Sequence, residues 1–200
     1  MKIPVLIVGG GPVGLGSSIL LSRFGIASLL VEKSNTTDYH PRARSINTRT
    51  LEIFRQWGVE DDMTAVSLPP EWAREMIYTT TLSGPEHGRI KTGSMSLRPG
   101  NDISPSGYLL SSQDVIEPIL RVAAESYPEA DVRFSTEMIS FEADEGGVRA
   151  EIKNVDTGET STVEADYMIG ADGVRSMVRE RLGYRLEGET SLAHSINTYF

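Results

Sequence analysis

The 200-residue chain carries 19 basic and 28 acidic residues, a formal net charge of −9, and it contains no cysteine. This charge and the lack of a basic run argue against nucleic acid and membrane surfaces as partners, and the absence of cysteine excludes disulfides, iron–sulfur clusters and cysteine-bound zinc. No apolar run approaches the roughly 20 residues that span a bilayer, and the three histidines do not have metal-ligand spacing. We therefore expect a cytoplasmic protein with no metal site and with a core built from its 39% apolar residues.

The first 33 residues predict a strand, a glycine turn, a helix and a second strand. An apolar run over residues 5–8 predicts a strand buried on both faces. The motif Gly-x-Gly-x-x-Gly over residues 9–14 ends it, and a helix is predicted from there to Gly25. A second apolar run, over residues 27–31, predicts a parallel strand. The apolar residues near helical spacing in the predicted helix are Val13, Leu15, Ile19, Leu20 and Phe24.

The glycine spacing has a chemical meaning. Gly9 allows the tight turn, Gly11 allows close approach of a pyrophosphate, and Gly14 allows the helix to pack on the strand. The start of the helix offers free N–H groups and a positive dipole end to that pyrophosphate. Glu32 ends the second strand, where an acidic residue accepts hydrogen bonds from a ribose diol. The pattern predicts a dinucleotide site; the alternative is a turn that serves packing alone, and the motif does not separate NAD from FAD.

A polar loop over residues 34–47 follows the second strand. Arg42 and Arg44 in this loop match paired phosphate oxygens, or they are two solvated surface arginines. A helix is predicted over residues 49–57, capped by Asn47 or Thr48 and ended by Gly58, with Trp57 in the core.

Residues 64–107 are rich in proline and glycine and predict a β-excursion, in which residues 75–82 pair back with residues 89–92. A helix is predicted from Ser112 to about Ser126, with Ile116, Ile119, Leu120 and Ala123 on its apolar face. Gln113, at the start of this helix, is either a plain polar residue or a ligand contact.

Alternating apolar residues predict a β-meander over residues 131–165 that includes Val132 and Phe134. Residues 167–170 predict a short buried strand, and residues 177–182 a helix closed by Gly183. This second strand–turn–helix predicts another helix start that faces a phosphate.

Three motifs in this order resemble the group A flavoprotein monooxygenases, the FAD-dependent aromatic hydroxylases of the para-hydroxybenzoate hydroxylase type. The first is the glycine motif with Glu32. The second is Pro-Arg-Ala-Arg-Ser-Ile-Asn over residues 41–47, followed by Arg-Thr-Leu-Glu over residues 49–52. The third is Gly-Ala-Asp-Gly-Val-Arg-Ser-x-x-Arg over residues 170–179. The resemblance covers essentially the whole chain and is nearest to the phenol and polyketide hydroxylase branch.

The resemblance implies that the three motif glycines approach the FAD pyrophosphate and that Glu32 holds the adenosine ribose. It also implies that Arg42 contacts FAD from its loop and that Gln113 does so from its helix start. The implied cofactor-binding set is Gly9, Gly11, Pro12, Val13, Gly14, Glu32, Lys33, Arg42, Gln113, Asp172, Gly173, Arg175 and Arg179.

In the third motif, Asp172 and Gly173 are implied to serve FAD and a transient nicotinamide cofactor near their pyrophosphates. Arg175 and Arg179 are implied to contact the nicotinamide cofactor. The implied fold is an α/β, Rossmann-like FAD-binding fold with a parallel sheet plus a β-meander, and part of a second, β-rich substrate domain. We expect the FAD-binding domain over residues 1–65 and 105–185, and the substrate domain over residues 66–104 and 186–200.

The implied activity is hydroxylation of a small aromatic substrate, phenolic or polyketide-type, by FAD with NADH or NADPH and O2. No catalytic residue is implied. Family members run well past residue 200, so the chain resembles the N-terminal part of an enzyme. The alternatives are another flavoenzyme of this fold (an epoxidase, halogenase or reductase), a non-catalytic FAD-binding module, and an NAD(P)-dependent dehydrogenase. The last explains residues 9–32 but not the Asp172-Gly173 stretch.

Overall fold

The structure, a computed structural model, describes residues 1–40, 43–69, 71, 75–91, 104–189, 193–194 and 196. The chain divides into two compact units. One is Met1–His40 with Leu120–Phe200, and the other is Pro41–Ile119. The division falls inside the helix α4 (Gln113–Glu125), which therefore begins in the second unit and ends in the first.

The first unit is built on a six-stranded sheet of order β7-β2-β1-β10-β9-β8. Four of its strands are β1 (Lys2–Val8), β2 (Ser28–Val31), β7 (Ala130–Arg133) and β10 (Thr160–Gly170). β1 pairs in parallel with β2 and with the second half of β10, and β2 pairs in parallel with β7. The carboxyl ends of these four strands therefore meet at one edge of the sheet.

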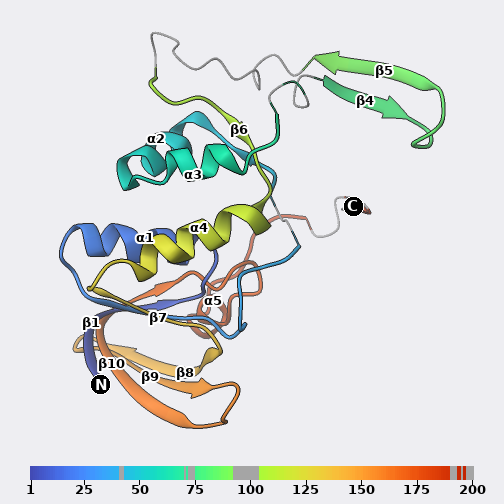
Figure 1. The fold of residues 1–200 in the computed structure, drawn as a ribbon. Helices are drawn as coiled ribbons and strands as arrows, with labels where there is room; N and C mark the ends of the chain where they lie inside the picture. Colours follow the sequence, from blue (N-terminus) through green and yellow to red (C-terminus); the bar gives the residue numbers. More distant parts are fainter. Residues whose placement is uncertain are drawn as a thin grey trace. The chain divides into compact units, whose positions relative to one another are not determined.

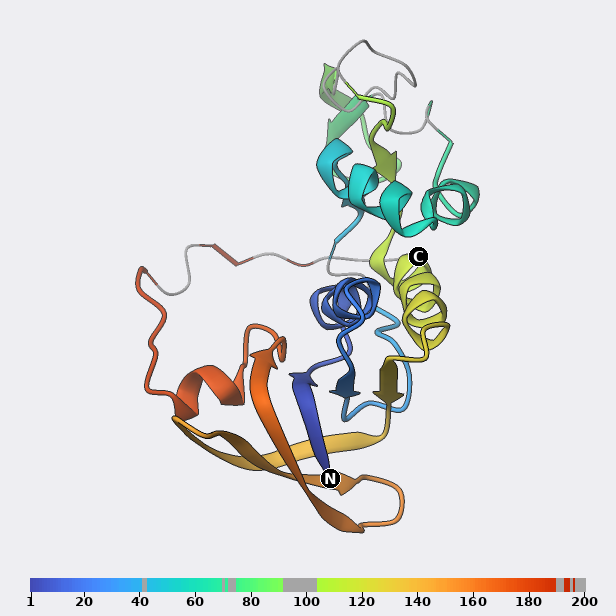
Figure 2. The same ribbon diagram turned by 90° about the vertical axis from the view of Figure 1, so that its left-hand side faces the viewer.

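The other two strands, β8 (Thr136–Asp144) and β9 (Gly147–Asn154), form an antiparallel meander with the first half of β10. β10 pairs with β9 up to Ala165 and continues beside β1 to Gly170. Figure 2 shows β8 and β9 passing across the side of the parallel strands that faces away from α1 (Pro12–Arg23). The expected combination of a parallel sheet and a meander is confirmed.

Two boundaries of the expected meander were wrong. Residues 130–133 are β7, a strand of the parallel sheet, because their backbone pairs with β2 after the α4 crossover. Residues 167–170 are not a separate buried strand but the end of β10, and Tyr167 is 73% exposed. Alternation reports which face a residue occupies but not its partner strand, and this is why both errors arose.

Apolar side chains fill both faces of the sheet. Leu6 and Val8 join residues of β2, β8, β9 and β10 in one buried cluster. Ile7 points to the opposite face, where α1 lies (Figure 1). The fold thus has a helix layer, a parallel sheet and a meander layer.

The buried face of α1 differs from the expected one. Leu15 and Ile19 are buried, but Val13, Leu20 and Phe24 are exposed. Small residues complete the buried face, namely Gly14, Gly16, Ser18 and Ser22. Small side chains let the helix approach the sheet closely. The spacing of large apolar residues does not identify such small residues as buried.

The second unit holds the helices α2 (Thr48–Trp57) and α3 (Glu60–Ala65) and the first half of α4. Asn47 caps α2 by accepting a hydrogen bond from the Thr50 N–H at 2.8 Å, and Gly58 ends the helix in a left-handed conformation, with φ 79°. Trp57 is half-buried rather than fully buried, and its ring lies 5.6 Å from that of Phe54. Trp57 therefore buries less of its surface in the core than the sequence predicts.

The strands of the second unit form two small sheets. β3 (Ser45–Ile46) pairs with β6 (Leu109–Leu110), and β4 (Glu75–Thr79) pairs with β5 (Glu86–Lys91) as the expected hairpin. Arg89 links the two hairpin strands by an ion pair with Glu75. The expected strand after residue 190 falls almost entirely outside the described residues. No helix in the described part of the chain is long and apolar enough to cross a membrane.

Candidate functional site

The sheet edge places the loops after β1, β2 and β10 side by side. Backbone hydrogen bonds extend the strand pairing into these loops. The Gly9 N–H donates to the Val31 carbonyl at 2.9 Å, and the Ala171 N–H donates to the Val8 carbonyl at 2.7 Å. The first and third sequence motifs, far apart in the chain, therefore lie next to each other.

Two glycines of the first motif, Gly9 and Gly14, are required by close backbone contacts. Gly9 has φ 111°, and a Cβ atom there would lie 2.3 Å from the Ala171 carbonyl oxygen. A Cβ atom at Gly14 would lie 1.8 Å from the Gly9 carbonyl oxygen. Real Cβ atoms do not approach other atoms this closely, so both positions need glycine for packing. Gly9 and Gly14 therefore serve packing, whether or not they also approach a ligand.

The start of α1 has the properties of an anion site. Gly11 is the N-cap and offers no side-chain cap, Pro12 begins the helix, and the first turn contains no acidic residue. Pro12 and Val13 are exposed and Gly11 is half-buried, so this helix start is open to solvent. An uncapped helix start presents unpaired N–H groups and the positive end of the helix dipole.

Glu32 lies at the end of β2, where the motif places it. Its carboxylate accepts a hydrogen bond from the Gly10 N–H at 2.7 Å and another from the Ser34 N–H at 2.8 Å. One oxygen serves each amide, and because a carboxylate has about four acceptor positions, each oxygen retains one. Glu32 thus holds the glycine loop in place and still has acceptor capacity for a hydroxyl group. Lys33 beside it is exposed.

Asp172 lies beside Gly9, but its side chain is directed toward the helix α5 (Met177–Arg181). Its carboxylate accepts hydrogen bonds from the Ser176 hydroxyl at 2.5 Å and from the Val178 N–H at 3.1 Å. The start of this five-residue helix is therefore occupied by an acidic side chain. The Val178 N–H is thereby already paired within the chain, and the expectation that this helix start faces a phosphate stays a prediction.

The rest of the third motif shapes the loop that carries Asp172. Gly173 has φ 79°, a conformation that residues with a Cβ atom rarely adopt. The Arg179 guanidinium donates to the Val174 carbonyl at 2.7 Å and so closes the loop from the helix side. Arg175 is exposed. Of the two arginines, Arg179 has a structural partner and Arg175 projects into solvent.

The second motif and Gln113 belong to the second unit. Arg42 lies outside the described residues, so its position is not described. The Gln113 N–H donates to the Ala43 carbonyl at 2.9 Å, and the Ser111 N–H donates to the Arg44 carbonyl at 3.0 Å. The backbone that follows Arg42 is therefore held against the residues that lead into α4.

Sequence reasoning did not single out Glu117, which is only 2% exposed. The Gln113 side-chain amide donates to its carboxylate at 2.5 Å, one helical turn away. The only sequence signal was the spacing of an amide and an acid four residues apart on one helix. This contact fixes the direction of the Gln113 amide group.

Comparison with known proteins identifies the family. Residues 2–200 match the family model described as an FAD binding domain. Over 202 residues the chain is 40% identical to a Streptomyces coelicolor protein named as a polyketide hydroxylase, covering 100% of this chain and 32% of that protein. Over 203 residues it is 37% identical to the 2,4-dichlorophenol 6-monooxygenase of Delftia acidovorans, covering 100% of this chain and 34% of the relative.

A solved structure shows the same fold. The crystal structure of the flavin-dependent monooxygenase PieE, in complex with FAD and substrate, superposes with a TM-score of 0.86 at 40% identity. The match covers 96% of this chain and 34% of that one. The chain therefore spans about a third of the length of the relatives that it matches.

Proposed function

Because the chain belongs to the FAD-binding domain family, we propose that it binds FAD at the sheet edge formed by the loops after β1, β2 and β10. The observation that carries this proposal is the convergence of the uncapped α1 start, the glycine loop and Glu32 within one unit. These groups match the parts of FAD that a Rossmann-type fold recognises: a pyrophosphate at the helix start and a ribose at the acid.

We propose that the motif glycines and the N–H groups of α1 hold the pyrophosphate, with Pro12 and Val13 at its edge. Glu32 accepts hydrogen bonds from the ribose hydroxyls, and Lys33 flanks it. Asp172 accepts hydrogen bonds from Ser176 and from the Val178 N–H, and so holds the loop that carries Gly173 at the site. Arg175 and Arg179 remain proposed contacts of the nicotinamide cofactor. The remaining proposed FAD contacts, suggested by the family resemblance, are Arg42 and Gln113.

We propose that the protein containing this chain is a monooxygenase that hydroxylates a small phenolic or polyketide-type aromatic compound. FAD supplies the redox and oxygen-transfer chemistry when bound, with NADH or NADPH as the reductant and O2 as the oxidant. The hydroxylases and the chlorophenol monooxygenase among the relatives support this class. The protein positions the cofactor and excludes water. We assign residues 66–104 and 186–200 to a substrate domain, and the protein to the cytoplasm.

The activity is tested on the protein that contains this chain. NADH or NADPH oxidation is followed with and without a panel of phenols, and the products are analysed by mass spectrometry. The proposal predicts faster oxidation with a phenol and a product that has gained one oxygen atom. If the enzyme halogenates, epoxidises or reduces a substrate and adds no hydroxyl group to its aromatic ring, the hydroxylase assignment is wrong.

A further inference from the structure

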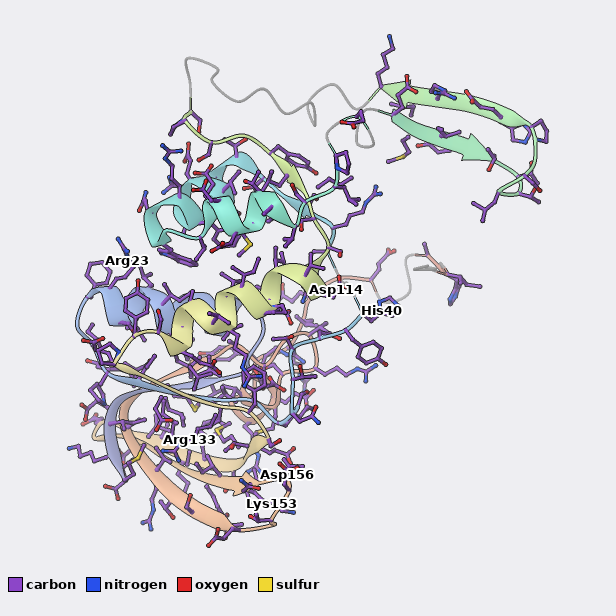
Figure 3. The ribbon with its side chains drawn as sticks, viewed as in Figure 1. Arg23, His40, Asp114, Arg133, Lys153 and Asp156 are labelled. Carbon is purple, nitrogen blue, oxygen red and sulfur yellow. The ribbon has the colours of Figure 1, made fainter. Side chains whose placement is uncertain are left out.

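The order of the strands predicts where the base of a bound dinucleotide must lie. The glycine loop follows β1, Glu32 follows the neighbouring strand β2, and Phe134 follows β7, the next strand along. If the pyrophosphate binds after β1 and the ribose binds after β2, the base lies after β7. Figure 3 labels Arg133, the last residue of β7 and the residue before Phe134.

The Phe134 ring reaches back from β7 to the glycine loop. A Cβ atom added at Gly10 would lie 2.7 Å from the Glu32 Cβ and 3.2 Å from the Phe134 Cζ. Glu32 and Phe134 therefore both lie next to the same buried glycine. Phe134 is half-buried, so it is not enclosed in the core.

Two further contacts fix this ring. The Arg121 guanidinium of α4 lies over it, with its Cζ atom 3.8 Å from the ring centroid. Backbone hydrogen bonds join the turn that carries Phe134 to the Glu32 loop: the Ser135 N–H donates to the Ser34 carbonyl, and the Thr136 N–H donates to the Glu32 carbonyl, each at 2.8 Å. The aromatic ring is thus held at a set position beside the proposed ribose site.

We propose that Phe134, with Arg121 on its face, forms the wall against which the adenine ring of FAD packs. A planar base is recognised by planar partners, because aromatic rings and guanidinium groups both stack on its face. This inference rests on the proposed FAD site and assigns two residues to its adenine end. The alternative is that Phe134 and Arg121 only stabilise the turn between β7 and β8.

The test compares the binding of ADP and UDP by the 200-residue chain, measured by isothermal titration calorimetry. Both ligands carry the ribose and the diphosphate, but UDP has a single-ring base. The wall predicts tighter binding of ADP, by about tenfold. In Phe134→Leu, which keeps an apolar side chain but removes the ring, this ratio should fall close to one. A purely structural role would weaken both ligands equally and leave the ratio unchanged.

Phe141→Leu is the matched control, because Phe141 is another half-buried phenylalanine, on β8, packed against the core under the sheet. It should keep the wild-type ratio. Arg121→Gln should lower the ratio, and an unchanged ratio would overturn the role of the guanidinium. If Phe134→Leu keeps the preference for ADP, the proposed adenine wall is wrong, but the proposed FAD site is not affected. A wild-type chain that binds neither ADP nor FAD would overturn the proposed function as well.

Discussion

Glu32 joins the glycine loop to the end of β2 through hydrogen bonds within the chain itself. Its two carboxylate oxygens bind the N–H groups of Gly10 and Ser34. Hydrogen bonds to a charged group are stronger than neutral ones. The same side chain therefore carries both the shape of the loop and the proposed contact with the ribose.

Glu32→Ala should accordingly lower two separate quantities. We expect the free energy of unfolding to fall by about 1–3 kcal/mol, because two charge-assisted hydrogen bonds are lost, and FAD affinity to fall by about tenfold or more. Glu32→Gln keeps one acceptor oxygen, so its stability and its FAD affinity should lie between those of the wild type and of Glu32→Ala. Urea denaturation and flavin titration measure the two effects. FAD affinity equal to that of the wild type would remove Glu32 from the binding site.

Gly9 and Gly25 offer a matched pair for the contact between the first and third motifs. Both have positive φ, 111° and 71°, but only Gly9 has a neighbour within reach of an added Cβ. Gly25→Ala should cost about 1–2 kcal/mol of stability from the backbone conformation alone. Gly9→Ala adds the clash with Ala171, and its total cost should be about 2–5 kcal/mol. Equal midpoints of unfolding for the two variants would contradict the close packing of the loops.

The sequence predicts the local backbone of the first motif, a strand, a glycine turn, a helix and a second strand followed by Glu32, because local spacing sets these positions. It does not predict the direction of the Asp172 side chain. That direction depends on two donors, Ser176 and Val178, which follow several residues later in α5. The partner of Arg179 is likewise a backbone carbonyl in the loop and has no sequence signal.

At the level of the elements, α5 shows how a short helix supports the third motif. Ser176 caps it by accepting a hydrogen bond from the Arg179 N–H at 2.9 Å, while its hydroxyl donates to Asp172. Ser176 is buried. The cap and the Asp172 loop therefore depend on one hydroxyl group.

Ser176→Ala should lower the free energy of unfolding by about 1 kcal/mol, the usual cost of a lost N-cap. Ser161→Ala is the control, since Ser161 is exposed on β10, and it should change stability by less than about 0.5 kcal/mol. Chemical denaturation of both variants measures the difference. Indistinguishable midpoints would show that the cap contributes nothing to α5.

The strands were harder to predict than the helices. Residues 130–133 have the same alternation as the meander that follows, yet they pair in parallel with β2. β10 changes partners along its length, from β9 to β1. Pairing between distant segments is a tertiary property, and the hydrophobic pattern carries only the face on which each side chain lies.

At the level of the whole molecule, the chain alternates between two units. It leaves the first unit after His40 and returns to it at Leu120. All the described parts of the first and third motifs fall in the first unit, whereas Gln113 and the second motif fall in the other. The sequence analysis assigned Gln113 and the second motif to the FAD-binding domain, residues 1–65 and 105–185, and it did not predict a division inside α4. The assignment of these residues to a functional domain stays a prediction.

FAD binding by this chain is measured by its visible absorption spectrum during titration with FAD, with NAD⁺ as the competitor. We expect a flavin band that shifts and saturates, with no displacement by NAD⁺, and a weaker titration in Glu32→Ala. A spectrum identical to that of free FAD at every protein concentration would show that the chain has no FAD site. Displacement of FAD by NAD⁺ would favour a dehydrogenase instead.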